Sequence, residues 1–109
     1  MKILAFEREV AGAPAGAFAS HSRAEAERVW ELHQAGVVRE LYFRDDRDEA
    51  VLVLECGGID EARAALASLP LVRAGLIDFE LVPLRAYPGF ARLFTPAAEA
   101  GTGPVRPGD

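Results

Sequence analysis

The sequence predicts an α+β domain with four strands and two helices in the order βαββαβ. Runs of apolar residues with the length and alternation of strands occur four times, and two stretches between them repeat apolar residues at helical spacing. Small, charged or helix-breaking residues separate these segments. Right-handed crossovers and one hairpin then place the strands in an antiparallel sheet with both helices on one face, the ferredoxin-like arrangement. The first and third strands are expected at the centre of the sheet, and the second and fourth at its edges.

The first third of the chain supplies one strand and one helix. Residues 2–10, KILAFEREV, form the first predicted strand, and the small residues of 11–19 form a loop. Ser22 and Glu25 have the spacing of a capping box, in which each side chain accepts a hydrogen bond from the other's backbone N–H. Gly36 is expected to end the helix, because glycine takes the left-handed conformation at little cost. The residues at helical spacing are Ala26, Val29, Trp30 and His33, with Leu32 beside them.

The middle of the chain predicts a hairpin and a second helix. Residues 37–44 and 50–56 are strands, and the charged residues 45–49 form the turn between them. Asp60 is the expected N-cap of the second helix, because its carboxylate can accept from an unpaired backbone N–H. One apolar stripe of that helix consists of Ala62, Ala65, Leu66 and Leu69.

Two prolines mark the last predicted elements. Pro70 is expected to end the second helix and thus to set the beginning of the last strand, residues 76–84. Pro83 is expected to end that strand, because proline cannot donate a ladder hydrogen bond. The sequence is therefore divided into a domain of residues 1–94 and a flexible tail of residues 95–109, which is rich in proline and glycine.

The composition excludes several classes of protein. The chain has 17 acidic and 12 basic side chains, a net charge of −5, which argues against nucleic-acid binding and against binding to a membrane surface. No apolar run approaches the length of a membrane span. The single cysteine, Cys56, cannot form an internal disulfide, which favours the cytoplasm.

The apolar residues of the two central strands fall on both faces. Two helices can cover only one face, and each large apolar side chain left in water costs about 1.5–3 kcal/mol. A second copy of the sheet is the simplest cover, so a homodimer is predicted. In the first strand the side chains of Ile3 and Ala5 point to one face of the sheet, and those of Leu4 and Phe6 point to the other. In the third strand Val51 and Val53 point to one face, and Leu52, Leu54 and Cys56 point to the other.

Short motifs add a resemblance over roughly residues 24–88. An E-L-x-x-x-G helix end occupies residues 31–36, SLPL occupies 68–71 and VPL occupies 82–84. In this order they resemble the muconolactone isomerase-like family of the dimeric α+β barrel superfamily. The resemblance implies two sheets facing each other across a ligand cavity, and a cofactor-independent isomerase that moves a proton on an oxygenated hydrophobic substrate. Known isomerases carry His at the position of Glu40 and Trp at that of Tyr42, so the resemblance does not specify the lactone.

The candidate site follows from the alternation of the second strand. Glu40, Tyr42 and Arg44 share the face opposite the helices. Glu40 is the candidate proton-transfer group, Tyr42 a phenol donor, and Arg44 a guanidinium for an acidic or carbonyl-bearing ligand. His21 at a cavity mouth and Arg73 in the last link are further candidate ligand-binding residues. The alternative is a solvated edge with cross-strand ion pairs.

Two other functions stay open at this point. One is a non-catalytic dimeric module that binds a small ligand, and the other is a cofactor-free monooxygenase of the same superfamily. No cofactor and no metal are expected, because the two histidines lack a supporting carboxylate motif and no Cys/His cluster accompanies them.

Overall fold

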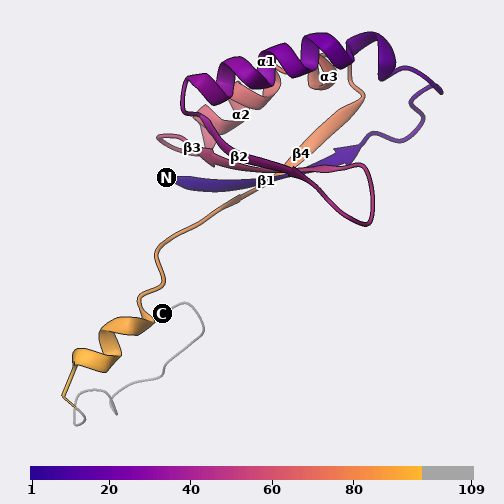
Figure 1. The fold of residues 1–109 in the computed structure, drawn as a ribbon. Helices are drawn as coiled ribbons and strands as arrows, with labels where there is room; N and C mark the ends of the chain where they lie inside the picture. The colour runs from indigo at the N-terminus through magenta and orange to yellow at the C-terminus, as the bar shows by residue number, and fades with distance from the viewer. Residues whose placement is uncertain (97–109) are drawn as a thin grey trace.

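A computed structural model describes residues 1–96 of the chain. It contains a four-stranded antiparallel sheet in the order β2-β3-β1-β4, with the helices on one face (Figure 1). The strands are β1 (Lys2–Glu9), β2 (Val38–Phe43), β3 (Ala50–Glu55) and β4 (Ile77–Pro83); the helices are α1 (Ser22–Gln34), α2 (Ile59–Ala67) and α3 (Pro70–Arg73), and the 3-10 turns are η1 (Ala19–His21) and η2 (Gly89–Phe94). The predicted α+β fold, its element order and its central and edge strands are confirmed.

The core lies between the sheet and the helices, where the predicted alternation puts it. Ala5 of β1 pairs with Leu52 of β3, and Ile3 pairs with Leu54, so four helix-facing side chains meet at the centre of the sheet. Each buried Leu or Ile contributes about 1.5–3 kcal/mol by leaving water. The buried cluster comprises Ile3, Ala5, Leu32, Val38, Leu52, Leu54, Ala62, Leu66 and Leu69.

The start of α1 differs from the predicted capping box. His21 occupies the cap position without a side-chain hydrogen bond, and Ser22 is already helical, with its hydroxyl donating to the Ala19 carbonyl at 3.0 Å. The Glu25 carboxylate accepts from the Leu71 backbone N–H at 2.9 Å instead. The reason is that η1 runs directly into α1, so Ser22 has no extended backbone from which to cap.

The end of α1 agrees with the prediction. Gly36 has a φ of +80°, which only glycine adopts at little cost. The Gly36 N–H donates to the His33 carbonyl and the Val37 N–H to the Leu32 carbonyl, both at 3.0 Å, which is the Schellman arrangement. The chain therefore reverses sharply into β2.

The predicted cap of α2 is also wrong. The helix begins at Ile59, one residue before Asp60, and the cap position is taken by Gly58 without a side-chain hydrogen bond. The Glu61 carboxylate accepts from the Gly57 backbone N–H, so a different acid satisfies the unpaired donor before the helix.

Pro70 has a different role from the predicted one. Helix α2 ends at Ala67, and Pro70 is the first residue of α3, where a missing N–H costs nothing. Strand β4 begins only at Ile77, so Pro70 does not set its beginning. Pro83 is the last residue of β4, as predicted.

A C-terminal arm follows β4 and leaves the body of the domain (Figure 1). Its turn η2 leaves Phe90, Leu93 and Phe94 exposed by 68, 76 and 86%. Of the predicted tail 95–109, residues 97–109 lie outside the described residues. The described helices are all too short or too polar to cross a bilayer.

Candidate functional site

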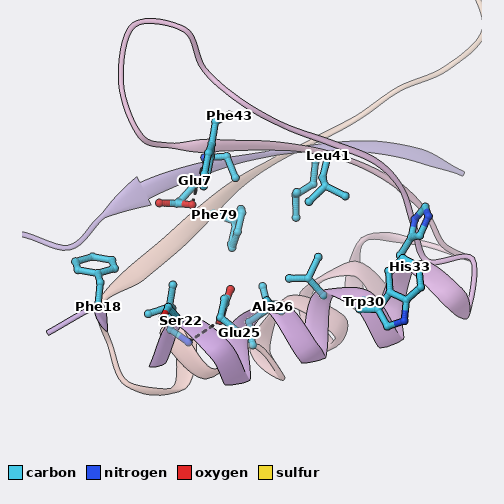
Figure 2. Close-up of a pocket in the computed structure, with 15 residues that line it drawn as sticks. Glu7, Phe18, Ser22, Glu25, Ala26, Trp30, His33, Leu41, Phe43 and Phe79 are labelled. Carbon is cyan, nitrogen blue, oxygen red and sulfur yellow. Dashed lines mark hydrogen bonds between the residues drawn. The ribbon is translucent and has the colours of Figure 1, made fainter. Parts of the chain in front are cut away.

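A pocket of about 550 Å³ lies between α1 and the helix-covered face of the sheet (Figure 2). This volume is in the range of sites for small organic molecules. Its wall is mainly apolar, with four polar side chains from β1 and α1. The aromatic lining residues are Phe18, Trp30, Phe43 and Phe79, and the polar ones are Glu7, Ser22, Glu25 and His33.

The pocket exists because α1 does not close fully onto the edge strand β2. Of the α1 side chains only Leu32 is buried, whereas Trp30 is 59% exposed. On the facing strand, Leu41 and Phe43 are 47 and 71% exposed although they point to the helix side. The helical stripe that the sequence predicts for α1 thus forms a pocket wall.

Glu7 is the buried acid of β1, with 8% of its surface exposed. It lies on the same face of the strand as Ile3 and Ala5, and its Oε1 accepts from the Ala50 backbone N–H at 3.2 Å. Burial raises the pKa of Glu7, and the charges of nearby acids raise it further against the opposing effect of the Ala50 hydrogen bond. Those acids are Glu49, Glu25 and Glu9.

Glu25 enters the pocket from α1, on the opposite wall (Figure 2). Burial raises its pKa too, while the Leu71 hydrogen bond and the charge of His21 lower it. Neighbouring acids hold the proton on Glu7, whereas His21 favours ionisation of Glu25. Both carboxyl groups of the pocket therefore have a raised pKa with burial as its main cause, and the further effects of nearby charges differ in sign between them.

His33 completes the polar lining near Trp30. Its Nδ1 lies 2.8 Å from the Val38 carbonyl oxygen, and the two rings are 5.6 Å apart between centroids. Because a carbonyl oxygen can only accept, Nδ1 carries the proton. In the neutral ring Nε2 is then an acceptor.

The predicted site residues Glu40 and Tyr42 lie together, but on the other face of the sheet. The Tyr42 hydroxyl donates to Glu40 Oε1 at 2.6 Å, and both side chains are exposed. This hydrogen bond and the Glu40 charge raise the pKa of Tyr42. Arg44 is not part of the pair, because its guanidinium donates twice to Asp46, at 2.8 and 2.6 Å.

The two remaining predicted residues do not line the pocket. His21 occupies the cap position of α1, and its charge acts on Glu25. Arg73 is the last residue of α3 and is exposed, with no side-chain partner among the described residues. The binding roles of His21 and Arg73 stay predictions.

Sequence reasoning missed Glu7 and Glu25. The signal for Glu7 was present, because in a central strand it shares the face of Ile3 and Ala5. A carboxylate on the buried face of a strand is costly unless it is hydrogen-bonded, paired or protonated, so such a residue is a candidate for a functional site. Glu25 was assigned to a capping box, which concealed its contact with α3. Within residues 1–96, no three His, Cys, Asp or Glu side chains are placed to hold a metal ion.

Comparisons with known proteins agree with the fold. The crystal structure of muconolactone isomerase matches with a TM-score of 0.64 and 22% identity, over 81% of this chain and 92% of that one. The 5-chloro-2-hydroxyhydroquinone dehydrochlorinase of Burkholderia phenoliruptrix AC1100, in complex with 2,5-dihydroxybenzoquinone, matches with a TM-score of 0.61 and 17% identity, over 78% of this chain and 94% of that one. No family model and no curated protein matches the sequence. The chain thus has the fold that these two proteins share.

Proposed function

We propose that this protein is a cofactor-independent enzyme of the isomerase type, which moves a proton on an oxygenated hydrophobic substrate bound between α1 and the sheet. The observation that carries the proposal is the pair of carboxyl groups with raised pKa, Glu7 and Glu25, in an otherwise apolar pocket. Two proteins of the same fold support it: one is named an isomerase, and the other is a dehydrochlorinase bound to an oxygenated ring compound.

The two carboxyl groups suit different steps of one proton transfer. Ionised Glu25 takes a proton from a carbon next to a carbonyl group, so that the C–H bond breaks and its electron pair forms an enolate. Protonated Glu7 donates a hydrogen bond to the enolate oxygen, where the negative charge develops. Glu25 then returns the proton to another carbon of the conjugated system. The product is an isomer, and no oxidant or reductant is consumed.

We also propose a homodimer in which the uncovered sheet faces pack together. In the described chain no helix covers this face (Figure 1). It carries five half-buried apolar side chains at its centre, and a second sheet would remove them from water. These are Leu4, Phe6, Val51, Val53 and Val82.

The single free cysteine, Cys56, supports a reducing, cytoplasmic location.

The assignment of proton transfer to Glu40, with Tyr42 orienting the ligand, is the competing proposal. It requires a cavity between the two sheets of the dimer, whereas the pocket beside Glu7 and Glu25 exists in one chain. Both proposals describe the same type of reaction, so variants of the two sites can decide between them.

The experiment measures deuterium incorporation by NMR when the protein is incubated in D₂O with a β,γ-unsaturated lactone such as α-angelica lactone. We expect Glu25→Gln to lose at least about a hundredfold in exchange rate, within the range of general-base catalysis. Glu27→Gln, an exposed acid on the same helix, is the matched control and should exchange at the wild-type rate. If only Glu40→Gln and Tyr42→Phe lose deuterium exchange, the proton transfer takes place on the other face of the sheet. If the wild type binds the lactone but exchanges no deuterium, the protein is a non-catalytic binding module.

A further inference from the structure

A second, smaller pocket, the α2 pocket, lies between α2 and the edge strand β4. Its volume is about 160 Å³, compared with about 550 Å³ for the pocket described above, the α1 pocket. Its wall is mostly aliphatic, with side chains from α2, α3 and β4. Among the described lining residues, only Phe79 of β4 belongs to both pockets. The two pockets are therefore neighbours on either side of this one aromatic ring.

Helix α3 and Phe79 together separate the two pockets. Successive residues of α3 line different pockets, because Leu71 lines the α1 pocket and Val72 lines the α2 pocket. The residues before α3 are divided in the same way, with Leu69 lining the α1 pocket and Leu66 the α2 pocket. The helix thus forms the part of the partition away from the sheet, and the Phe79 side chain forms the part that rises from the sheet.

The strand β4 fixes the position of Phe79. In the antiparallel register Phe79 lies opposite Glu7 of β1, and residues paired in this way have their Cβ atoms about 4.5–5.5 Å apart. Phe79 is half-buried and packs against the hydrophobic core, as Leu81 does two residues further along the strand. Its side chain points from the sheet into the α1 pocket (Figure 2). The ring therefore ends the α1 pocket next to Glu7.

We propose that Phe79 determines how long a substrate can be, because its ring closes the α1 pocket toward the α2 pocket. This role rests on the proposed function, in which the α1 pocket binds the substrate. An apolar group that extends beyond the α1 pocket stays in water and adds little to binding. Without the Phe79 ring the two pockets form one longer apolar space that reaches α2. Phe79 is thus a specificity-determining residue of the site.

A series of straight-chain primary alcohols measures the length limit. Trp30 lines the α1 pocket and is the only tryptophan of the chain, so its fluorescence detects binding there. Each CH₂ group that leaves water should strengthen binding about fourfold, and each one beyond the limit should add little. In Phe79→Ala we expect the limit to move by about two carbons, so that the longer alcohols bind about fifteenfold more tightly than to the wild type.

Two further variants distinguish the Phe79 ring from the rest of the wall. Phe18→Ala is the matched control, because it removes the same ring from another wall of the α1 pocket, and it should leave the length limit unchanged. Phe79→Leu should move the limit less than Phe79→Ala, in the same direction, and it replaces that variant if Phe79→Ala does not fold. An unchanged limit in the Phe79 variants, an equal shift in Phe18→Ala, or no alcohol binding to the wild type would overturn the proposal.

A filled α2 pocket checks that the longer alcohols enter it. Ala67 lines the α2 pocket and Ala64 lies on the same helix outside both pockets, and both are exposed. Combined with Phe79→Ala, Ala67→Phe should restore the length limit of the wild type, whereas Ala64→Phe should not. If Ala67→Phe leaves the longer limit of Phe79→Ala in place, the added length is not bound in the α2 pocket and the proposal is wrong.

Alcohol binding involves no turnover, so its outcome is independent of the deuterium-exchange experiment. If the limit moves as expected but the wild type exchanges no deuterium into the lactone, the proposed reaction fails while the role of Phe79 as the end wall stands. If deuterium is exchanged and the limit does not move, the proposed reaction stands and Phe79 does not determine the length of the substrate.

Discussion

The carboxyl groups of Glu7 and Glu25 enter one apolar pocket from opposite walls, the first from the central strand β1 and the second from α1. Each has one oxygen fixed by a backbone N–H, Ala50 for Glu7 and Leu71 for Glu25. The backbone thus orients both groups before any ligand arrives, which is a property expected of a catalytic pair.

The raised pKa of Glu7 predicts how the stability of the fold depends on pH. Because the folded state holds this proton more tightly than the unfolded state does, stability is greatest at or below the ordinary glutamate pKa of 4.5 and falls as pH rises through the higher folded pKa. Glu7→Gln cannot ionise, so its melting temperature should fall less between acid and neutral pH. Thermal unfolding across that range, with exposed Glu27→Gln as the control, measures the difference. If the melting temperatures of Glu7→Gln and the wild type fall equally with rising pH, the pKa of Glu7 is not raised in the folded state.

The two faces of β3 predict opposite consequences for neighbouring substitutions. Leu54 is fully buried under the helices, so Leu54→Ala should lower the free energy of unfolding by about 2–5 kcal/mol, and Leu54→Glu should prevent folding. Val53 is half-buried on the uncovered face, so Val53→Glu should keep the circular dichroism spectrum of the fold.

Analytical ultracentrifugation tests whether Val53→Glu changes the oligomeric state of the protein while its fold is kept. The wild type should sediment as a dimer at micromolar concentration and Val53→Glu as a monomer, because the added charge would be buried between the sheets. A monomeric wild type would refute the proposed dimer.

The hydrogen bond between Tyr42 and Glu40 predicts a measurable phenol titration. Glu40→Gln removes the charge that raises the pKa of Tyr42, so this phenol should ionise at lower pH, closer to its ordinary value of 10.0. Ultraviolet absorbance in a Tyr87→Phe background isolates Tyr42, because the chain has only two tyrosines. An unchanged titration would mean that the pair does not form in solution.

The strands could be predicted from the sequence, and the pocket could not. Alternation along β1 separates Ile3 and Ala5 from Leu4 and Phe6, and this local pattern suffices to assign the faces. The pocket depends on how far α1 stands from β2, which is set by packing between elements distant in the chain. The same limit explains Glu25: its spacing to Ser22 fits a cap, but its hydrogen-bond partner is 46 residues away.

The exposed arm after β4 is predicted to contribute little to the stability of the single domain. The side chains of Phe90, Leu93 and Phe94 are mostly exposed, and the ring contact of the arm is internal, between Tyr87 and Phe90 at 5.2 Å. A chain that ends at Arg85 should therefore keep its free energy of unfolding within about 0.5 kcal/mol at concentrations where the protein is monomeric. Removal of residues 97–109 alone should change the melting temperature little.

Urea unfolding at low and high protein concentration tests this expectation for the arm. If the arm contacts a second copy, the loss on truncation will grow with concentration, because a contact between chains stabilises by mass action. A loss of several kcal/mol that does not depend on concentration would instead mean that the arm packs on its own domain, and the boundary at residue 94 would then be wrong.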